Sequence, residues 1–155
     1  MHLSAALGAV AIVTSGATFV LAEHASGPGR GHQRTVAFTV VERAESDTVI
    51  DNGTSGDSIG DVIAFGNPIY NASNTVRIGR NQGSCVRTNP GSSYECQWTL
   101  VLSKGTVVVQ GPFNDSSDST MAITGGTGRY DGASGQMVLH ARDATSYDFR
   151  YTLHQ

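Results

Sequence analysis

Residues 76–111 constrain the fold more than any other stretch, because they contain three apolar segments separated by two tight turns. The first turn, at residues 89–92, has the sequence NPGS, which consists of strong turn formers. Folding the chain symmetrically about the centre of this turn sets Cys85 opposite Cys96 on neighbouring antiparallel strands. The stretch therefore predicts a three-stranded antiparallel sheet with a cross-strand cysteine pair.

The middle segment of this sheet, residues 94–103, alternates apolar and polar side chains. A period of two is typical of a strand that is buried on one face. The even positions include Tyr94, Cys96 and Trp98, whereas the odd positions are mostly polar. We therefore expect one face of this strand to be lined by two aromatic rings and a cysteine.

The composition extends the prediction to the rest of the chain. A length of 155 residues with 39% hydrophobic side chains is enough for one domain with a real core. The chain has 19 glycines and almost no helical spacing of Ala, Leu, Glu or Lys, which indicates short strands and tight turns. A net charge of -3 with scattered Lys and Arg argues against nucleic acid as a partner. The predicted class is all-β.

The first 33 residues differ in kind from the rest. Residues 1–22 contain no Asp, Glu, Lys or Arg and include an apolar run, which predicts a secretory signal peptide cleaved after Ala22. A retained membrane anchor is the alternative, although glycine and hydroxyl residues weaken it. Residues 23–33 predict a flexible leader without a metal site. The mature protein is expected to be secreted, without stable membrane association.

Residues 34–155 predict about eight strands, enough to close an antiparallel barrel with room for one small ligand. The first strand, which starts at Arg34, is apolar on both faces, so we expect it to be covered on both sides. Residues 47–58 form a polar, glycine-rich loop in this prediction, and the next strand begins near Asp61. A carboxylate at that point lies either on the rim or in the lumen, where burial would raise its pKa.

Four segments in this order resemble the allene oxide cyclase and dirigent barrel superfamily, most closely its small secreted bacterial members. They are GDVIAFGNPIY at 60–70, IGRNQGSCV at 78–86, GTVVVQGPF at 105–113 and ITGGTGRYDGASGQMVL at 123–139. The resemblance covers nearly all of residues 34–155. It implies an eight-stranded barrel, usually trimeric, whose lumen binds a hydrophobic or phenolic molecule and shapes its cyclisation or coupling without a cofactor.

The resemblance also assigns residues to the lumen. These are Thr39, Val41, Asp61, Ile63, Phe65, Cys85 and Phe113. It matches Thr39, Val41 and Phe113 with a glutamate, an asparagine and a tyrosine of plant allene oxide cyclases, which implies that this chain lacks those groups. Asp61 then remains as the one lumen carboxylate. Cys85 faces Cys96, and in an oxidising compartment the two are expected to form a disulfide.

Two classes of function remain open. One is a cofactor-free isomerase or cyclase in which Asp61 acts as acid or base and Tyr94 or Trp98 stabilises positive charge. The other is a non-catalytic, lipocalin-like binding protein that needs only an apolar cavity. In both, the predicted ligand-binding residues are Thr39, Val41, Ile63, Phe65, Tyr94, Trp98 and Phe113, with no cofactor and no metal.

The first strand also carries a prediction about assembly. If Thr39 and Val41 point inward, then Val36, Phe38 and Val40 point outward. An exposed apolar row of this kind marks an interface on a soluble protein. Together with the resemblance, it predicts a homotrimer.

Overall fold

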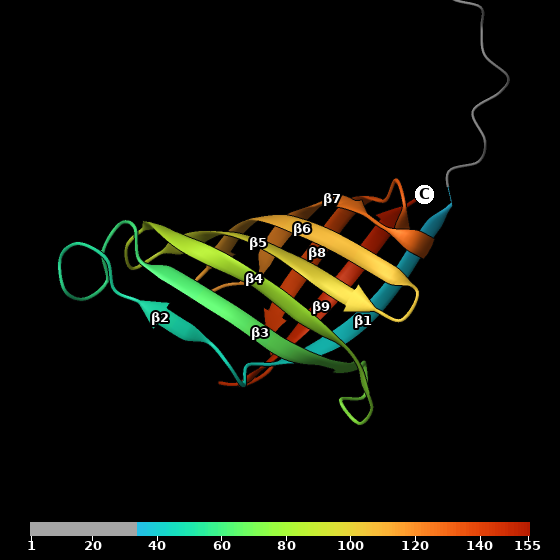
Figure 1. Cartoon of the computed structure of the whole chain (residues 1–155), viewed down its shortest axis with the longest axis horizontal. Coiled ribbons are helices and arrows are strands. Elements are labelled where there is room, and N and C mark those ends of the chain that lie inside the picture. The colour runs from blue at the N-terminus through green and yellow to red at the C-terminus, as the bar shows by residue number, and fades with distance from the viewer. Residues whose placement is uncertain (1–33) are drawn as a thin grey trace, which may run out of the picture. The chain divides into compact units, whose positions relative to one another are not determined.

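The computed structural model describes residues 34–155, which form nine β-strands, and eight of these close an antiparallel barrel (Figure 1). The predicted signal peptide and leader lie outside the described residues. The elements are β1 (Thr35–Arg43), β2 (Thr48–Ile50), β3 (Val62–Asn71), β4 (Arg77–Asn89), β5 (Ser93–Leu102), β6 (Gly105–Asn114), β7 (Ser119–Gly126), the 3-10 turn η1 (Gly128–Tyr130), β8 (Ser134–Ala141) and β9 (Ser146–His154). The predicted all-β class and closed barrel are confirmed.

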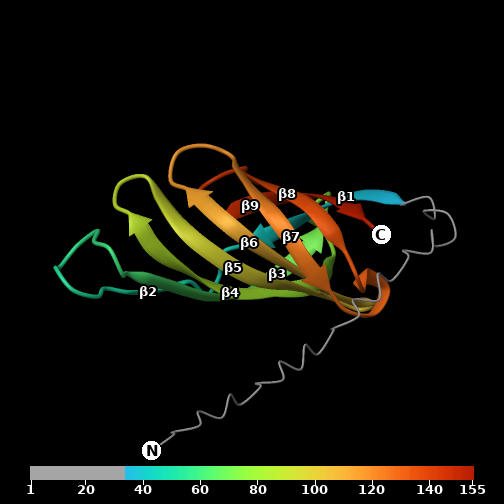
Figure 2. The ribbon, with the colours of Figure 1, turned by 90° about the horizontal axis from the view of Figure 1, so that it is seen from above.

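The barrel closes by pairing the first long strand with both the last strand and β3. From β3 to β9 each strand pairs with its neighbour in sequence, so the sheet curls in chain order (Figure 2). β1 pairs with β9 from Thr35–His154 to Arg43–Ser146, and with β3 at three positions. The short β2 pairs with β3 within the stretch predicted to be a loop, and it lies outside the eight-strand circuit.

The predicted hairpin between β4 and β5 is confirmed in register. Cys85 lies directly opposite Cys96, and the two form a disulfide bond. Gly91 adopts a φ of +68° in the turn, a conformation that glycine reaches without steric strain. The turn chemistry therefore sets the register that brings the two sulfur atoms together.

The prediction of which side chains of β1 point inward is wrong, because the inner and outer faces of the strand are exchanged. Phe38, Val40 and Glu42 lie opposite Tyr151, Phe149 and Tyr147 of β9, and the β9 residues all point into the barrel. Thr39 and Val41 share the opposite, outer face with Arg150 and Asp148. Because both faces of β1 are apolar, its own sequence does not distinguish them, whereas β9 alternates cleanly and fixes the register.

This correction removes the structural basis of the assembly prediction. The row formed by Val36, Phe38 and Val40 packs in the core or against it. The outer face of β1 instead carries Ala37, Thr39 and Val41. The trimer therefore stays a prediction that rests on family resemblance alone.

The lumen is filled at one end and hollow at the other. At the filled end the ring of Phe38 stacks on Tyr151 at 5.0 Å between ring centroids, and Tyr130 of η1 lies 6.3 Å from Phe38. The opposite end is surrounded by residues 44–61, 90–92, 115–118 and 142–145, which we call the mouth loops. A molecule that enters the lumen must pass these loops.

Arg87 near the end of β4 holds two of the mouth loops in place. Its Nη1 donates to both carboxylate oxygens of Asp115 at 2.8 Å, and its Nε lies 2.6 Å from Oδ1 of Asp57. The guanidinium group lies over the ring of Tyr94, 3.5 Å from the ring centre. This buried cation therefore ties the loop before β3 and the loop after β6 to the β4–β5 hairpin.

Gly83 lets β4 pass close to the side chain of Trp98 on β5. A Cβ atom at position 83 would lie 2.5 Å from Trp98 Cβ and 2.3 Å from the carbonyl oxygen of Gln97. No real side chain tolerates such contacts, so a residue larger than glycine would push the two strands or the indole apart. The glycine thereby fixes where the indole lies in the lumen.

Candidate functional site

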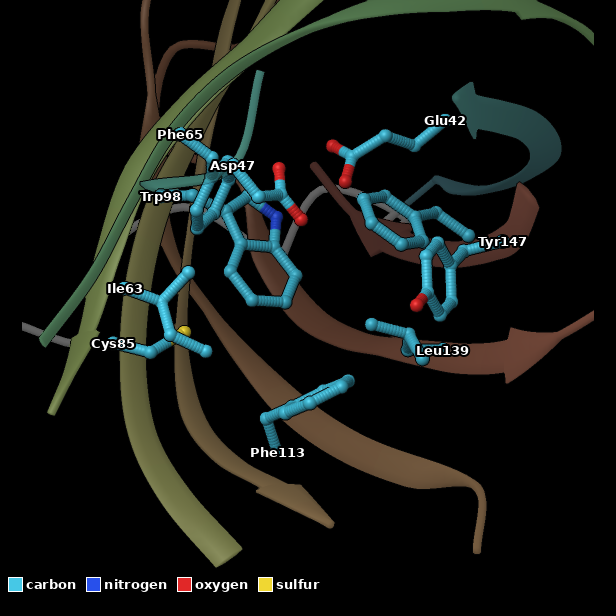
Figure 3. Close-up of a pocket in the computed structure, with 10 residues that line it drawn as sticks. Glu42, Asp47, Ile63, Phe65, Cys85, Trp98, Phe113, Leu139 and Tyr147 are labelled. Carbon is cyan, nitrogen blue, oxygen red and sulfur yellow. The ribbon is translucent and has the colours of Figure 1, made fainter. Parts of the chain in front are cut away.

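A cavity of about 60 Å³, measured as the space open to the centre of a water molecule, lies at the mouth end of the lumen (Figure 3). This volume accommodates a few water molecules. It is lined by Glu42, Asp47, Ile63, Phe65, Cys85, Trp98, Phe113, Leu139, Tyr147 and Phe149. Two of these ten side chains are carboxylates, and five are aromatic.

A second hollow of about 420 Å³, which we call the vestibule, adjoins this cavity. Phe113, Leu139 and Tyr147 line both spaces, so they separate the inner cavity from the vestibule. The vestibule continues outward along residues 114–118 and 140–141. A molecule larger than the inner cavity would extend between these three side chains into the vestibule.

Glu42 is the buried carboxyl group of the cavity. Its Oε2 accepts a hydrogen bond of 2.7 Å from Nδ2 of Asn81, and its Oε1 accepts one of 3.3 Å from Nδ2 of Asn67. Burial raises the pKa of Glu42 to about 7, and the charge of Asp47 acts in the same direction, while the two amide hydrogen bonds oppose the shift. Glu42 can therefore both donate and accept a proton near neutral pH.

Asn67 holds the two carboxylates of the cavity together. Its Oδ1 accepts hydrogen bonds of 3.0 Å from the backbone N–H groups of Glu45 and Ser46, which fixes the orientation of its amide. Its Nδ2 is then directed at Glu42 and, at 2.7 Å, at Oδ1 of Asp47. The carboxylates of Glu42 and Asp47 consequently lie near one another at the same side of the cavity, as Figure 3 shows.

The predicted lumen position of Asp61 is wrong. Its Oδ1 accepts a 2.8 Å hydrogen bond from the backbone N–H of Asn52, and its Oδ2 accepts one of 2.8 Å from that of Ser58. These bonds, from Ser58 first and then Asn52, lower the pKa of Asp61, where lumen burial was expected to raise it. Asp61 precedes β3, where the chain turns into a mouth loop, so its carboxylate organises that loop and does not reach the cavity.

The other predicted lumen residues divide into two groups. Ile63, Phe65, Cys85, Trp98 and Phe113 line the cavity, and their predicted role in ligand binding stays a prediction. Tyr94 does not line the cavity, because its ring packs beside Phe113 and under the guanidinium group of Arg87.

Sequence reasoning missed five residues that line the cavity. These are Glu42, Asp47, Leu139, Tyr147 and Phe149. The alternation in β9 does place Tyr147 and Phe149 on one face, and this signal was sufficient to find both. Glu42 was hidden by the two apolar faces of β1, and Asp47 lies in a loop that has no periodicity.

The aromatic side chains pack against one another around Trp98. The indole stacks on Phe149 with ring centroids 5.4 Å apart, and Phe65 meets it edge to face at 6.0 Å. Such packing fixes the orientation of the rings, which together form an apolar wall. Its Phe65 and Trp98 side chains lie on the side of the cavity facing Glu42 (Figure 3).

Among residues 34–155, no three His, Cys, Asp or Glu side chains come together as a metal site. In the same part of the chain, no helix is long and apolar enough to cross a bilayer. The cavity's own side chains offer a group for proton transfer in Glu42 and positioning by the aromatic wall.

Solved structures share this barrel at low sequence identity. A pyocyanin demethylase has a TM-score of 0.69 and 23% identity, over 76% of this chain and 99% of its own. A pterocarpan synthase dirigent protein has a TM-score of 0.70 and 15% identity, over 90% of this chain and 99% of its own. An exo-specific intermolecular Diels-Alderase has a TM-score of 0.66 and 15% identity, over 81% of this chain and 100% of its own. At these identities the likeness establishes the fold.

The family of this chain is identified by a match between its sequence and a family model. The model of the family described as allene oxide cyclase matches residues 32–153, which is nearly the entire described part of the chain. The match includes every strand except the last residue of β9. This chain therefore belongs to the allene oxide cyclase family.

Proposed function

We propose that the protein binds a small hydrophobic or phenolic molecule in its lumen and guides the cyclisation or coupling of that molecule without a cofactor. Glu42 is the group that exchanges a proton with the ligand, in place of Asp61. The observation that carries the proposal is a buried carboxyl group that faces an aromatic cavity and has a pKa of about 7.

Guided ring closure requires a cavity of fixed shape that holds the ligand in a reactive conformation. Holding a reactive molecule in a near-attack conformation supplies a large part of the rate enhancement for an intramolecular reaction. The wall formed by Phe65, Trp98 and Phe149 is held by ring-to-ring packing, and Gly83 fixes the indole. The names of two similar structures, a Diels-Alderase and a pterocarpan synthase dirigent protein, agree with ring formation in this type of barrel.

Binding without catalysis is the second candidate. It is favoured by the hydrogen bonds that occupy both oxygens of Glu42, because an engaged carboxylate is less free to approach a ligand. In this case the aromatic wall alone would hold the molecule, as in lipocalin-like carriers.

Secretion and trimerisation complete the proposal. The Cys85–Cys96 disulfide supports an oxidising compartment, since such bonds are rare in a reducing cytosol. The predicted signal peptide agrees with this location. Trimerisation rests on the resemblance to the family.

The test is a comparison of wild type with Glu42→Gln on small-molecule extracts of the host, analysed by liquid chromatography and mass spectrometry. Cyclisation conserves mass, so wild type should convert one compound into an isomer with a different retention time. Glu42→Gln retains the shape of the side chain but cannot transfer a proton, and conversion should fall about 100-fold or more. Native mass spectrometry should still find the compound bound to the variant.

Glu95→Gln is the matched control, because Glu95 is an exposed carboxylate on the outer face of β5. It should convert the compound at the wild-type rate. Full conversion by Glu42→Gln would contradict the catalytic role, and bound compound without any conversion by wild type would establish the carrier function instead.

A further inference from the structure

We propose that the lumen selects a positively charged aromatic molecule over neutral and anionic molecules of the same shape. The inference rests on the proposed function, since it names the class of ligand for the same cavity. It follows from the charges and the aromatic rings that surround the cavity and the vestibule.

The acidic groups are distributed along the whole path into the lumen. Glu42 and Asp47 line the inner cavity, where one amide group joins them. Asp115 and Asp118 line the vestibule. Asp115 and Asp118 are paired with Arg87 and His140, so the carboxylates left to attract a positive charge are Glu42 and Asp47 beside the cavity.

The basic side chains near this path are already engaged by carboxylates. Arg87 bonds both oxygens of Asp115 and lies beside Asp57. In the vestibule, Nδ1 of His140 lies 2.8 Å from Oδ1 of Asp118. Among residues 34–155, no Lys or Arg lines the cavity or the vestibule. An anionic ligand would thus leave water for a site without a free cation, which is unfavourable.

The aromatic wall adds a second attraction for a cation. Phe65, Trp98, Tyr147 and Phe149 all line the cavity. Phe65 and Trp98 lie on the side facing the carboxylate of Glu42, whereas Tyr147 is the direct neighbour of Glu42 on β9 (Figure 3). Ring faces attract cations electrostatically, most strongly when the cation is desolvated, and Trp is the best partner. A flat aromatic cation can pack its ring on this wall and direct its charge toward Glu42 and Asp47.

Selection for positive charge depends on the ionisation of Glu42. The groups that face this carboxyl are Asp47 from the loop after β1, Tyr147 and Tyr151 from β9, and the neutral amides of Asn67 and Asn81. Burial raises the pKa values of both tyrosines, so they stay neutral near pH 7. Among the groups that face one another here, Glu42 is then the one whose charge changes between about pH 6 and about pH 8.

The test uses three probes of one shape: N-methylquinolinium, which is always a cation, quinoline, which is neutral near pH 7, and quinoline-2-carboxylate, which is an anion. Binding to the full chain is measured by isothermal titration calorimetry at about pH 6 and about pH 8. The cation should bind about tenfold tighter than quinoline at the higher pH, and the anion weakest. The affinity for N-methylquinolinium should rise about fivefold to tenfold from about pH 6 to about pH 8, while the affinity for quinoline stays constant.

Substitutions of the cavity carboxylates test whether the preference for the cation arises in the cavity. Glu42→Gln should lose most of the preference for the cation and all of its rise in affinity between the two pH values, while the smaller contribution of Asp47 and the rings remains. Asp47→Asn, at an exposed position, keeps an oxygen that can accept from Asn67 and should reduce the preference for the cation in part. Glu95→Gln removes the same charge from the outer face and should behave as wild type.

The outcomes separate this inference from the proposed function. Equal binding of quinoline and N-methylquinolinium, or tighter binding of the carboxylate, would overturn the charge selection and leave an aromatic binding site in place. Failure of wild type to bind all three probes would overturn both. A cation preference that is undiminished in both Glu42→Gln and Asp47→Asn would place the binding elsewhere and overturn the inference.

Discussion

Glu42 is stabilised in its neutral form by burial, so its side chain links the stability of the protein to pH. The folded-state pKa of about 7 lies above the ordinary value of 4.5. A carboxyl group with a raised folded-state pKa favours folding at a pH below its unfolded-state pKa. This contribution is lost as the pH rises from 4.5 to about 7, and it stays absent above that range.

We therefore expect Glu42→Gln to gain stability relative to wild type as the pH rises. The difference between the two free energies of unfolding should change by about 3 kcal/mol between about pH 4.5 and about pH 8. Urea denaturation followed by the fluorescence of Trp98, the single tryptophan, measures both proteins. Glu95→Gln should show no such change, and a constant difference for Glu42→Gln would mean that the carboxyl is ionised throughout.

For single residues, the sequence predicted that the cavity holds aromatic rings and a carboxyl group, but it placed the carboxyl group at the wrong residue. The aromatic lumen residues Phe65, Trp98 and Phe113 were found because they lie on strands with clear alternation or family motifs. Asp61 has the correct parity for the lumen, but two backbone N–H groups of its own loop attract its carboxylate. Such loop hydrogen bonds leave no periodic signal in the sequence.

At the scale of elements, the mouth loops have defined positions because Arg87 binds them. The guanidinium group is 7% exposed and meets Asp57, Asp115 and the ring of Tyr94. Removing one partner of a buried ion pair leaves the remaining charges without compensation. The two aspartates are partly hydrated, which reduces that penalty.

Arg87→Ala should therefore lower the free energy of unfolding by about 2 kcal/mol. Hydrogen exchange should accelerate in residues 51–61 and 115–118, while the β8–β9 hairpin exchanges as in wild type. Arg80→Ala, at an exposed outward position of β4, is the control and should change neither quantity. Unchanged exchange in both loops would show that other contacts hold them.

The elements that the sequence predicted well are those fixed by local chemistry. The β4–β5 hairpin follows from its turn, and β9 follows from its alternation. The short β2 was missed because its polar, glycine-rich surroundings give no strand pattern and its pairing is provided by β3 alone. The faces of β1 depend on its partners at both ends of the chain, which a local pattern does not contain.

For the whole molecule, the disulfide restricts the unfolded chain. Cys85 and Cys96 are 11 residues apart, and closing a loop of this length in the unfolded state corresponds to about 3 kcal/mol of stability. Reduction before urea denaturation should lower the free energy of unfolding by up to this amount. The double variant Cys85→Ala/Cys96→Ala should be insensitive to reductant. Equal stability of the oxidised and reduced wild type would mean that strain offsets the restriction.

The pairing of β1 with β9 has a consequence for how the protein is made. A ribosome releases β1 before the other strands and β9 after them, and even the pair nearest in sequence in that ladder, Arg43 and Ser146, is 103 positions apart. Until β9 emerges, one long edge of β1 has no partner, and Glu42 and the rings that will line the cavity stay open to water. The site is therefore assembled only after β9 has emerged, and until then the unpaired edge of β1 is the point at which nascent chains can pair wrongly with one another.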